Sequence, residues 1–347
     1  MTASDPTERL RESWRLGTLT VPNRVLLAPL AGIGNWFVRL QAKRYGAGMV
    51  VSEMVSSHAI HHRNERTCGE MLRIDPRERE AGAGGPVSIQ LFGEDPATMR
   101  SAAAVVAERG ADAIDINMGC PVPKVRKTGA GAQLLSDPDR AVALARAAVE
   151  GGGGLPVTVK LRSGLRPGDD AGFGVAHRLV AEAGVAAIGF HPRSAAVHHK
   201  GHPDYELAAR LVATLPAPVI LTGGLDDAGS AREAFEATGA DAVMLARGAL
   251  GNPWLFERLL GRREEEPAPE EVREELAWTI DRAVEHLGEA RACRYLRKFY
   301  PWYLPRLGLD RERTRALQEA LQSAESVDQA RLLLALDQRP HALAAGS

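Results

Sequence analysis

The stretch Ala113–Pro121, whose sequence is AIDINMGCP, decides the fold of this chain. Apolar side chains alternate along its first six residues, which predicts a short β-strand. A glycine and a proline then end the strand and leave Asn117 and Cys120 at its carboxyl end. There we expect the amide and the thiol to face a pocket rather than a core. An amphipathic run at 96–109 precedes the stretch, so a helix leads into the strand.

A short apolar strand followed by a helix recurs about eight times from Val25 onward. The expected strands are Val25–Leu30, Met49–Ser52, Val87–Phe92, Ala113–Met118, Val157–Arg162, Ala187–His191, Val219–Thr222 and Ala242–Ala246. The expected helices include Trp36–Tyr45, Pro96–Arg109, Pro138–Glu150, Gly172–Ala183, Tyr205–Thr214 and Ser230–Thr238. Glycines that predict left-handed C-caps follow several helices, at Gly46, Gly110, Gly151, Gly184 and Gly239. Such repeats over about 230 residues predict a closed (β/α)8 TIM barrel rather than an open doubly wound sheet.

The barrel is one of four expected parts of the chain. These are an N-terminal tail and hairpin (1–24), the barrel (25–260), a charged, proline-bearing linker (261–269) and a small helical bundle with its tail (270–347). In the last part we expect helix from Glu270 to about Arg339, with a break at 300–301 and a turn at 307–308. The tail from Pro340 is expected to be frayed.

The composition excludes several classes of protein. The chain has 347 residues, with 43 basic and 44 acidic side chains, so no global field indicates a nucleic acid or a membrane. Its three cysteines lie far apart and show no spacing typical of zinc sites or disulfides, and we expect no metal. The first residues lack the apolar core of a signal peptide, and no run is long enough to cross a bilayer. We therefore expect a cytoplasmic monomer with neither a membrane nor a DNA partner.

In a TIM barrel the chemistry lies where the strands end. Lys160 stands on an otherwise apolar strand and needs a partner there. One possibility is a salt bridge to Glu53 or Asp115; the other is a cation beside an electron-rich flavin ring, with Gln90 hydrogen-bonded to the same ring. The pair Gly223-Gly224 and the pair Arg247-Gly248 are typical of a barrel's phosphate corner, although ordinary strand-to-helix turns would give the same pattern.

The residues around Cys120 allow three interpretations of this thiol. A free cysteine is commonly a core filler. Its neighbouring glycine and proline, and the basic run Lys124–Lys127, place it instead in a turn beside a positively charged loop. A protonated thiol there suits proton donation, whereas nearby cations that lower its pKa would favour nucleophilic attack. The residues leave this choice open.

Several motifs of this chain match those of a known enzyme family. The chain resembles the tRNA-dihydrouridine synthases, and is similar above all to their bacterial B-type branch. The matching motifs are Ala28–Gly32, Val51–Met54, Asp115–Pro121 followed by Lys124-Val125, Val157–Gly164, Gly239–Met244 and Trp302–Leu304. The resemblance runs from about Arg15 into the helical tail, and the Asn-x-Gly-Cys-Pro motif followed by lysine is its most specific element.

The resemblance implies an FMN enzyme that reduces the C5–C6 double bond of a tRNA uridine and uses NADPH to reload the flavin. Hydride would reach C6, and Cys120 would be the acid that protonates C5. FMN would be held by Pro29, Leu30, Ala31, Gln90, Lys160, His191, Thr222, Gly223, Gly224, Ala246 and Arg247. Asn117, Lys124, Arg162 and Arg193 would face the extruded base and its phosphates. In the helical tail, Arg291, Arg294 and Lys298 fall on one helix face and would contact tRNA, unless they form an ordinary solvated face.

Some positions depart from the family pattern. This chain has Leu30 where the family usually has Met, and Pro192 and Ser194 where it has Gly and Thr. It has Thr222 in place of Asn, Ala246 in place of Gly and Phe299 in place of His. Two rival functions remain beside the family's own. One is a flavin barrel acting on free pyrimidines, which gives no role to the basic loop or the helical tail. The other is a non-catalytic RNA-binding module, for which Thr222 and Ala246 are the best support. Flavin absorbance of the purified protein separates the enzyme from the module.

Overall fold

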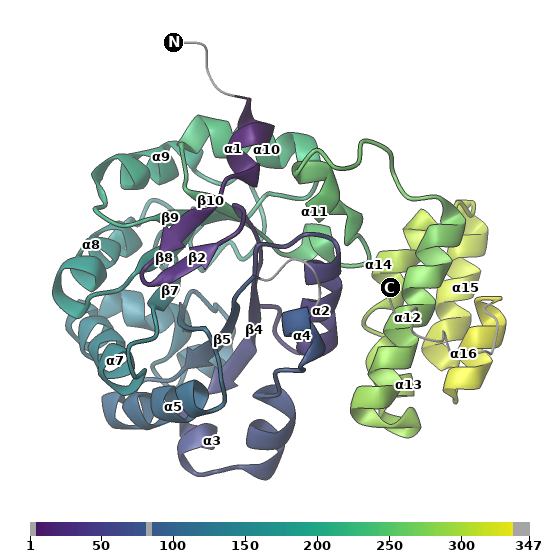
Figure 1. The fold of residues 1–347 in the computed structure, drawn as a ribbon, viewed down its shortest axis with the longest axis horizontal. Coiled ribbons are helices and arrows are strands. Elements are labelled where there is room, and N and C mark those ends of the chain that lie inside the picture. The colour runs from purple at the N-terminus through teal and green to yellow at the C-terminus, as the bar shows by residue number, and fades with distance from the viewer. Residues whose placement is uncertain (1–4, 81–84, 336–347) are drawn as a thin grey trace. The chain divides into compact units, whose positions relative to one another are not determined.

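The computed structural model describes residues 5–80 and 85–335, which fall into two compact units. The first unit comprises the chain up to Gly248 together with Leu255–Arg262, and the second comprises Ala249–Trp254 and the chain from Arg263 onward. Figure 1 shows strands surrounded by helices in the first unit and helices alone in the second. The frayed tail expected from Pro340 lies outside the described residues.

The first unit contains a closed barrel of eight parallel strands, in the order β10-β3-β4-β5-β6-β7-β8-β9. Their bounds are β3 Val25–Leu27, β4 Met49–Ser56, β5 Val87–Phe92, β6 Ala113–Met118, β7 Val157–Arg162, β8 Ala187–His191, β9 Val219–Thr222 and β10 Ala242–Leu245. The predicted TIM barrel is confirmed. Three strand ends differ from expectation: β3 stops before Pro29, which lacks an N–H group, β10 stops one residue early, and β4 runs four residues further. The extension of β4 follows a register shift between Val51 and Met54.

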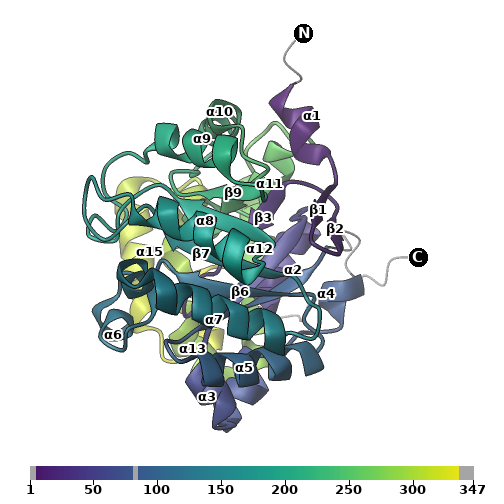
Figure 2. The same cartoon turned by 90° about the vertical axis from the view of Figure 1, so that its left-hand side faces the viewer.

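Helices cover the outside of the barrel, as Figure 2 shows for α7, α8 and α9. The helices of this unit that follow strands include α2 Trp36–Arg44, α5 Pro96–Glu108, α7 Pro138–Gly151, α8 Ala171–Ala183, α9 Tyr205–Thr214 and α10 Ala228–Thr238. Most begin at an Asn or Asp side chain that accepts a first-turn N–H, for example Asp95 for α5 and Asp204 for α9. Gly184 and Gly239 are left-handed C-caps, as predicted.

Gly151 is a different case, and the prediction of a left-handed cap there is wrong. This glycine is the last residue of α7, and Gly152 follows it with a φ of −75°. A Cβ on Gly151 would lie 2.2 Å from the carbonyl oxygen of Arg100 on α5. The missing side chain therefore permits close packing of two helices rather than a turn.

A hairpin closes the amino-terminal end of the barrel. It consists of β1 Trp14–Leu16 and β2 Leu19–Val21, and it follows a short helix, α1 Pro6–Arg11, that the sequence did not reveal. Trp14, Leu16 and Val21 are buried in one cluster with residues near the amino ends of the strands. The predicted hairpin therefore acts as a plug and leaves the opposite end of the barrel for chemistry.

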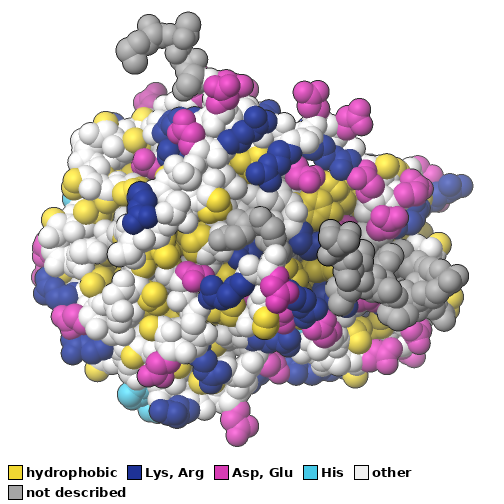
Figure 3. Space-filling model, in the orientation of Figure 1, with side chains coloured by type: hydrophobic (Ala, Val, Ile, Leu, Met, Phe, Trp, Pro, Cys, Tyr) yellow, Lys and Arg dark blue, Asp and Glu magenta, His cyan; other side chains and the backbone are white. Residues whose placement is uncertain are grey.

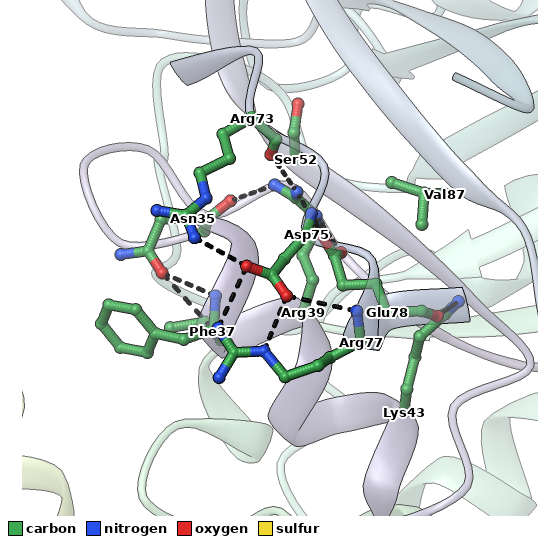
Figure 4. Close-up of polar contacts among 12 residues, drawn as sticks. Asn35, Phe37, Arg39, Lys43, Ser52, Arg73, Asp75, Arg77, Glu78 and Val87 are labelled. Atoms are coloured by element: carbon green, nitrogen blue, oxygen red, sulfur yellow. Dashed lines mark hydrogen bonds and ion pairs between the residues drawn. The ribbon is translucent and has the colours of Figure 1, made fainter. Parts of the chain in front are cut away.

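The connection between β4 and β5 carries a buried ion pair on the outside of the barrel. It contains α3 Ser57–His61, a single π-helical turn η1 Thr67–Met71 and α4 Arg77–Glu80. Figure 4 shows Arg39 of α2 in a two-point contact with Glu78 of α4, with Nε–Oε1 2.7 Å and Nη2–Oε2 2.9 Å. Both side chains are 0% exposed. The Lys43 ammonium donates to the Glu78 carbonyl, so the connection is anchored to α2 twice.

The second unit is helical, with α12 Pro269–Leu287, α13 Glu289–Leu296, α14 Tyr300–Tyr303, η4 Leu304–Arg306, α15 Arg311–Ser323 and α16 Val327–Leu333. The break expected at 300–301 lies slightly earlier: α13 ends at Leu296 and α14 begins at Tyr300, with Pro301 in its first turn. A further break, which was not predicted, lies at Gly288, whose φ is +71°. Gly308, with a φ of +68°, marks the expected turn at 307–308.

The surface carries charges of both signs, in keeping with the balanced composition. On the face shown in Figure 3, lysine and arginine side chains are interspersed with aspartate and glutamate. Among the described residues, none of the helices is both long enough and apolar enough to cross a membrane.

Candidate active site

The carboxyl ends of β5, β6 and β7 bring three predicted site residues side by side. In the register of the parallel sheet, Gln90 on β5 is paired with Asp115 on β6, and Asn117 on β6 is paired with Lys160 on β7. Side chains two residues apart on one strand point to the same face. Gln90, Asn117 and Lys160 therefore gather at one place in the barrel mouth.

A chain of hydrogen bonds links these strands to the cysteine turn. Gln90 Nε2 donates to Asp115 Oδ2 at 2.6 Å, and Asn117 Nδ2 donates to Gln90 Oε1 at 2.8 Å. Asn117 Oδ1 accepts the backbone N–H groups of Gly119 at 3.2 Å and Cys120 at 2.9 Å. Asn117 also directs its amide toward the Met54 sulfur at 3.7 Å. The amide that we predicted to face a substrate thus already holds the turn that carries Cys120.

Cys120 lies in that turn as a free, half-buried thiol. Its carbonyl oxygen accepts the N–H of Ala132 at 3.1 Å. Gly131 packs closely behind it, because a Cβ there would come within 2.8 Å of the same carbonyl. Lys124, on the short helix α6 Pro123–Arg126, is exposed nearby in the sequence. Cys120 is therefore neither fully buried in the core nor fully solvated.

Lys160 is half-buried and forms no ion pair within the part of the chain that the structure describes. Burial, together with the charge of Arg162, lowers its pKa to about 8, while Asp115 and Cys120 act in the opposite direction. The salt bridge to Glu53 or Asp115, which the sequence left open, does not form. Gly189 on β8 leaves room beside the lysine stem, since a Cβ there would lie 3.3 Å from Lys160 Cγ. An ammonium group without a fixed partner fits an anionic or electron-rich ligand.

Two arginines predicted to face the substrate are engaged with loop carbonyls. Arg162 is 3% exposed and donates to Gly119, Ser194 and His198. Burial, with the charge of Arg193, lowers its pKa to about 10. Arg193 donates twice to the Gly201 carbonyl, at 3.1 and 2.8 Å. These guanidinium groups shape the loops after β6 and β8 as well as carrying positive charge.

His191 and the glycine pair after β9 form a tight corner. Gly223 and Gly224 have φ values of +99° and +80°, and a Cβ on Gly223 would lie 2.4 Å from His191 Nε2. Tyr205 Oη donates to the Gly223 carbonyl at 3.1 Å. Burial, and the charges of Lys160, Arg162 and Arg193, lower the pKa of His191 well below its usual value. The corner therefore offers backbone and a neutral imidazole in a space that a side chain would fill, which fits a bound phosphate.

The remaining predicted residues lie in four places. Pro29, Leu30 and Ala31 follow β3, and Thr222 ends β9 as a buried side chain. Ala246 and Arg247 follow β10, where Arg247 is exposed. Arg291, Arg294 and Lys298 belong to the second unit and are exposed, whereas Ala292, Cys293 and Leu296 of the same segment are buried. Arg291 and Arg294 lie on the exposed side of α13 (Glu289–Leu296), whereas Lys298 follows the end of that helix, so the predicted helix face holds for two of the three cations.

The sequence analysis named Asp115 only as a possible ion-pair partner of Lys160, and it missed Thr158, His199 and Tyr205, which complete the mouth. Asp115 and Thr158 lie beneath Gln90, with Thr158 Oγ1 donating to Asp115 Oδ1 at 2.5 Å. His199 stacks on His191 with ring centroids 6.1 Å apart. A signal existed for Asp115, because a carboxylate in the middle of an apolar strand requires partners. His199 and Tyr205 carry no comparable signal.

Polar side chains gathered at the carboxyl ends of a closed parallel barrel define the class of (β/α)8-barrel enzymes. The sequence also matches the family model described as "Dihydrouridine synthase (Dus)" over residues 26–339. The chain belongs to the dihydrouridine synthase family, so the family predicted from the motifs is confirmed.

Named relatives agree with this assignment, and a solved structure is similar in fold. The chain is 38% identical over 303 residues to tRNA-dihydrouridine synthase B of Pseudomonas aeruginosa, covering 86% of this chain and 89% of that protein. It is 33% identical over 320 residues to tRNA-dihydrouridine synthase B of Vibrio cholerae, covering 91% and 95%. The fold is similar to that of morphinone reductase in complex with tetrahydroNAD, with a TM-score of 0.55, 19% identity, and coverage of 76% of this chain and 93% of that one. That last likeness concerns the fold alone.

Proposed function

We propose that this protein is an FMN-dependent tRNA-dihydrouridine synthase that reduces the C5–C6 double bond of a uridine in tRNA. Membership of the dihydrouridine synthase family supports this function, as do relatives named tRNA-dihydrouridine synthase B. The observation that carries it is the half-buried Cys120 thiol in the turn after β6, joined by hydrogen bonds to the residues beside Lys160.

FMN fits the residues of the mouth. Lys160, without an ion pair in the described chain, suits a position beside the flavin ring, where its charge stabilises negative charge. We assign the ring to Pro29, Leu30, Ala31, Gln90 and Lys160. We assign the phosphate to the corner formed by His191, Thr222, Gly223, Gly224, Ala246 and Arg247, where the space beside Gly223 would be lost to any side chain. When bound, FMN supplies the hydride that adds to C6 of the uracil ring, and NADPH is the proposed source of that hydride.

The chain's own residues supply the proton and the positioning. Cys120 holds a proton on Sγ, which passes to C5 as the double bond is reduced, so hydride and proton together account for the two added hydrogens. Asn117 holds the Cys120 turn in place through two backbone N–H groups. Asn117, Lys124, Arg162 and Arg193 are proposed to contact the base and the adjacent phosphates. The target base must leave its stack to enter a barrel mouth.

The second unit is the proposed contact with the body of the tRNA. Arg291, Arg294 and Lys298 are exposed cations on one segment of this unit. Contacts of this kind position an RNA without reading its sequence and weaken as the salt concentration rises. We further propose that the protein acts as a monomer in the cytoplasm, where its tRNA substrate is found, and that it has neither a DNA nor a membrane partner.

A test of the function combines absorbance with product analysis. The purified protein should carry flavin absorbance and, with NADPH, form dihydrouridine in an unmodified tRNA transcript. Cys120→Ala should keep FMN and tRNA binding while product formation falls by about 100-fold or more. Cys68→Ala, which removes another partly buried thiol, is the matched control and should leave turnover unchanged. Reduction of free uracil but not of tRNA would contradict the proposal, and so would unchanged turnover in Cys120→Ala.

A further inference from the structure

A hydrogen-bond chain of fixed direction runs from a buried carboxylate to the cysteine turn. Its members are Asp115, Gln90 and Asn117, and it ends on the backbone N–H groups of Gly119 and Cys120. Asp115 is 2% exposed and Gln90 is 1% exposed, so water does not substitute for these bonds.

The two ends of the chain determine the orientation of both amides between them. An ionised carboxylate only accepts hydrogen bonds, so Gln90 must direct its NH2 group toward Asp115. Its carbonyl oxygen then faces Asn117, which must donate. This leaves the carbonyl oxygen of Asn117 for the two backbone N–H groups, which can only donate. The donors and acceptors of all four hydrogen bonds match only when each amide has this orientation.

We propose that Asp115 is a positioning residue for Cys120, acting through Gln90 and Asn117. Without an acceptor-only group at its base, Gln90 can rotate its amide by half a turn and present its NH2 group to Asn117. Asn117 would then rotate as well and turn its own NH2 group toward Gly119 and Cys120. Two donors would face two donors, and the turn that carries the thiol would lose both bonds. The hydrogen-bond role stands on the protein alone, and the consequence for turnover rests on the proposed function.

The decisive measurement is amide hydrogen exchange of Gly119 and Cys120 in the full-length protein, without tRNA. In Asp115→Asn, which keeps the shape but introduces a donor, both amides should exchange about tenfold faster, as expected for the loss of one hydrogen bond each. Gln90→Leu removes the amide that transmits the orientation, so the exchange of the two amides should no longer depend on position 115. Adding Asp115→Asn to Gln90→Leu should then change nothing further.

A swap of carboxylate and amide separates positioning from general stability. In Asp115→Asn with Gln90→Glu, the acceptor-only group moves to position 90, where it can accept from both neighbours, and the net charge is that of the original chain. Protection of Gly119 and Cys120 should return. In Asp115→Asn, kcat should fall while KM for tRNA stays nearly constant. Because Gln90 is assigned to the flavin ring, the double variant is judged by hydrogen exchange alone.

Two results would overturn the proposal. One is exchange in Asp115→Asn that is unchanged at Gly119 and Cys120. The other is acceleration that extends along β6 to the Ile114 amide, which bonds to Pro156 instead, and that the double variant does not correct. Because exchange is measured without substrate, the inference can stand or fall separately from the reaction.

Discussion

Gly223 and His191 are in such close contact that no side chain fits between them: a Cβ on Gly223 would lie 2.4 Å from His191 Nε2. The φ of +99° at Gly223 independently disfavours any other residue. The proposed phosphate corner therefore depends on a glycine for two separate reasons.

Gly223→Ala should weaken FMN binding by about tenfold or more, because the imidazole must move and the backbone is strained. Titration of the protein with FMN, followed by quenching of flavin fluorescence, measures the affinity. Gly174→Ala is the control, since Gly174 lies within α8 and nothing approaches its Cβ position within 4 Å. Equal FMN affinity in both variants would contradict the assignment of the FMN phosphate to this corner.

Lys160 should couple FMN binding to proton uptake. Burial and the charge of Arg162 lower the pKa of its ammonium to about 8, so near that pH much of it is neutral. A bound ligand with negative charge favours the protonated form and raises this pKa. Calorimetric titrations near pH ~8, in two buffers of different ionisation enthalpy, should therefore show uptake of a fraction of a proton. The Lys160→Met variant should bind FMN more weakly and take up no proton at that pH. Equal proton uptake in the variant would show that a group other than Lys160 takes up the proton.

Asp115 should make the protein less stable as the pH rises. Burial raises the pKa of this carboxyl to about 6, against the opposing effects of Gln90, Thr158 and Lys160. A folded-state pKa above the unfolded value of 3.8 gives stability that is complete below 3.8 and lost as the pH rises through about 6. Between about pH 5 and about pH 7.5 the contribution to the free energy of unfolding should fall by about 1 kcal/mol.

The Asp115→Asn variant lacks this titration. Urea unfolding at the two pH values should show the variant gaining about 1 kcal/mol relative to the original chain as the pH rises. A constant difference between the two proteins would show that Asp115 titrates normally. A variant that gains stability relative to the original chain as the pH rises, yet is slower in turnover, would mark the ionised carboxylate as a functional rather than a stabilising feature.

Replacing only one partner of the buried ion pair between Arg39 and Glu78 should strongly destabilise the protein. Arg39→Met leaves a carboxylate without its partner at 0% exposure and should lower the free energy of unfolding by about 3–5 kcal/mol. Arg39→Met with Glu78→Gln should recover part of this loss, because the charge is gone and an oxygen remains for the Asp75 N–H. Urea unfolding measures both. Arg315→Met, at an exposed pair, is the control and should have little effect.

The barrel and the family could be predicted from the sequence because their signals are local. Alternating apolar runs gave the strands, and a compact motif around Cys120 gave the family, which the family match confirms. The four-residue extension of β4 could not be predicted, because it depends on pairing across a register shift with β5. The role of Gly151 also depends on a distant residue, since only the approach of Arg100 distinguishes close packing from a cap.

The polar network of the mouth was predicted only in part. Gln90, Asn117 and Lys160 stood out as polar residues at strand ends, and the structure places them together. The sequence does not show which amide donates to which, because that depends on the register between β5 and β6. It also could not show that Arg162 would be tied to the carbonyl of His198, because that residue lies in the loop after a different strand. Arg193 bonds to Gly201 within its own loop, but the path of that loop could not be predicted from the sequence.

Within the part of the chain that the structure describes, the hairpin of Trp14, Leu16 and Val21 covers the amino-terminal end of the barrel. A barrel that is covered at its amino-terminal end cannot bind a nicotinamide at that end while it binds an RNA at the carboxyl-terminal end. If the proposed chemistry is right, the electron donor and the nucleotide must visit the same opening in succession, each departing before the next arrives. A few apolar side chains at the start of the chain would thereby impose the order of events at the far end of the barrel.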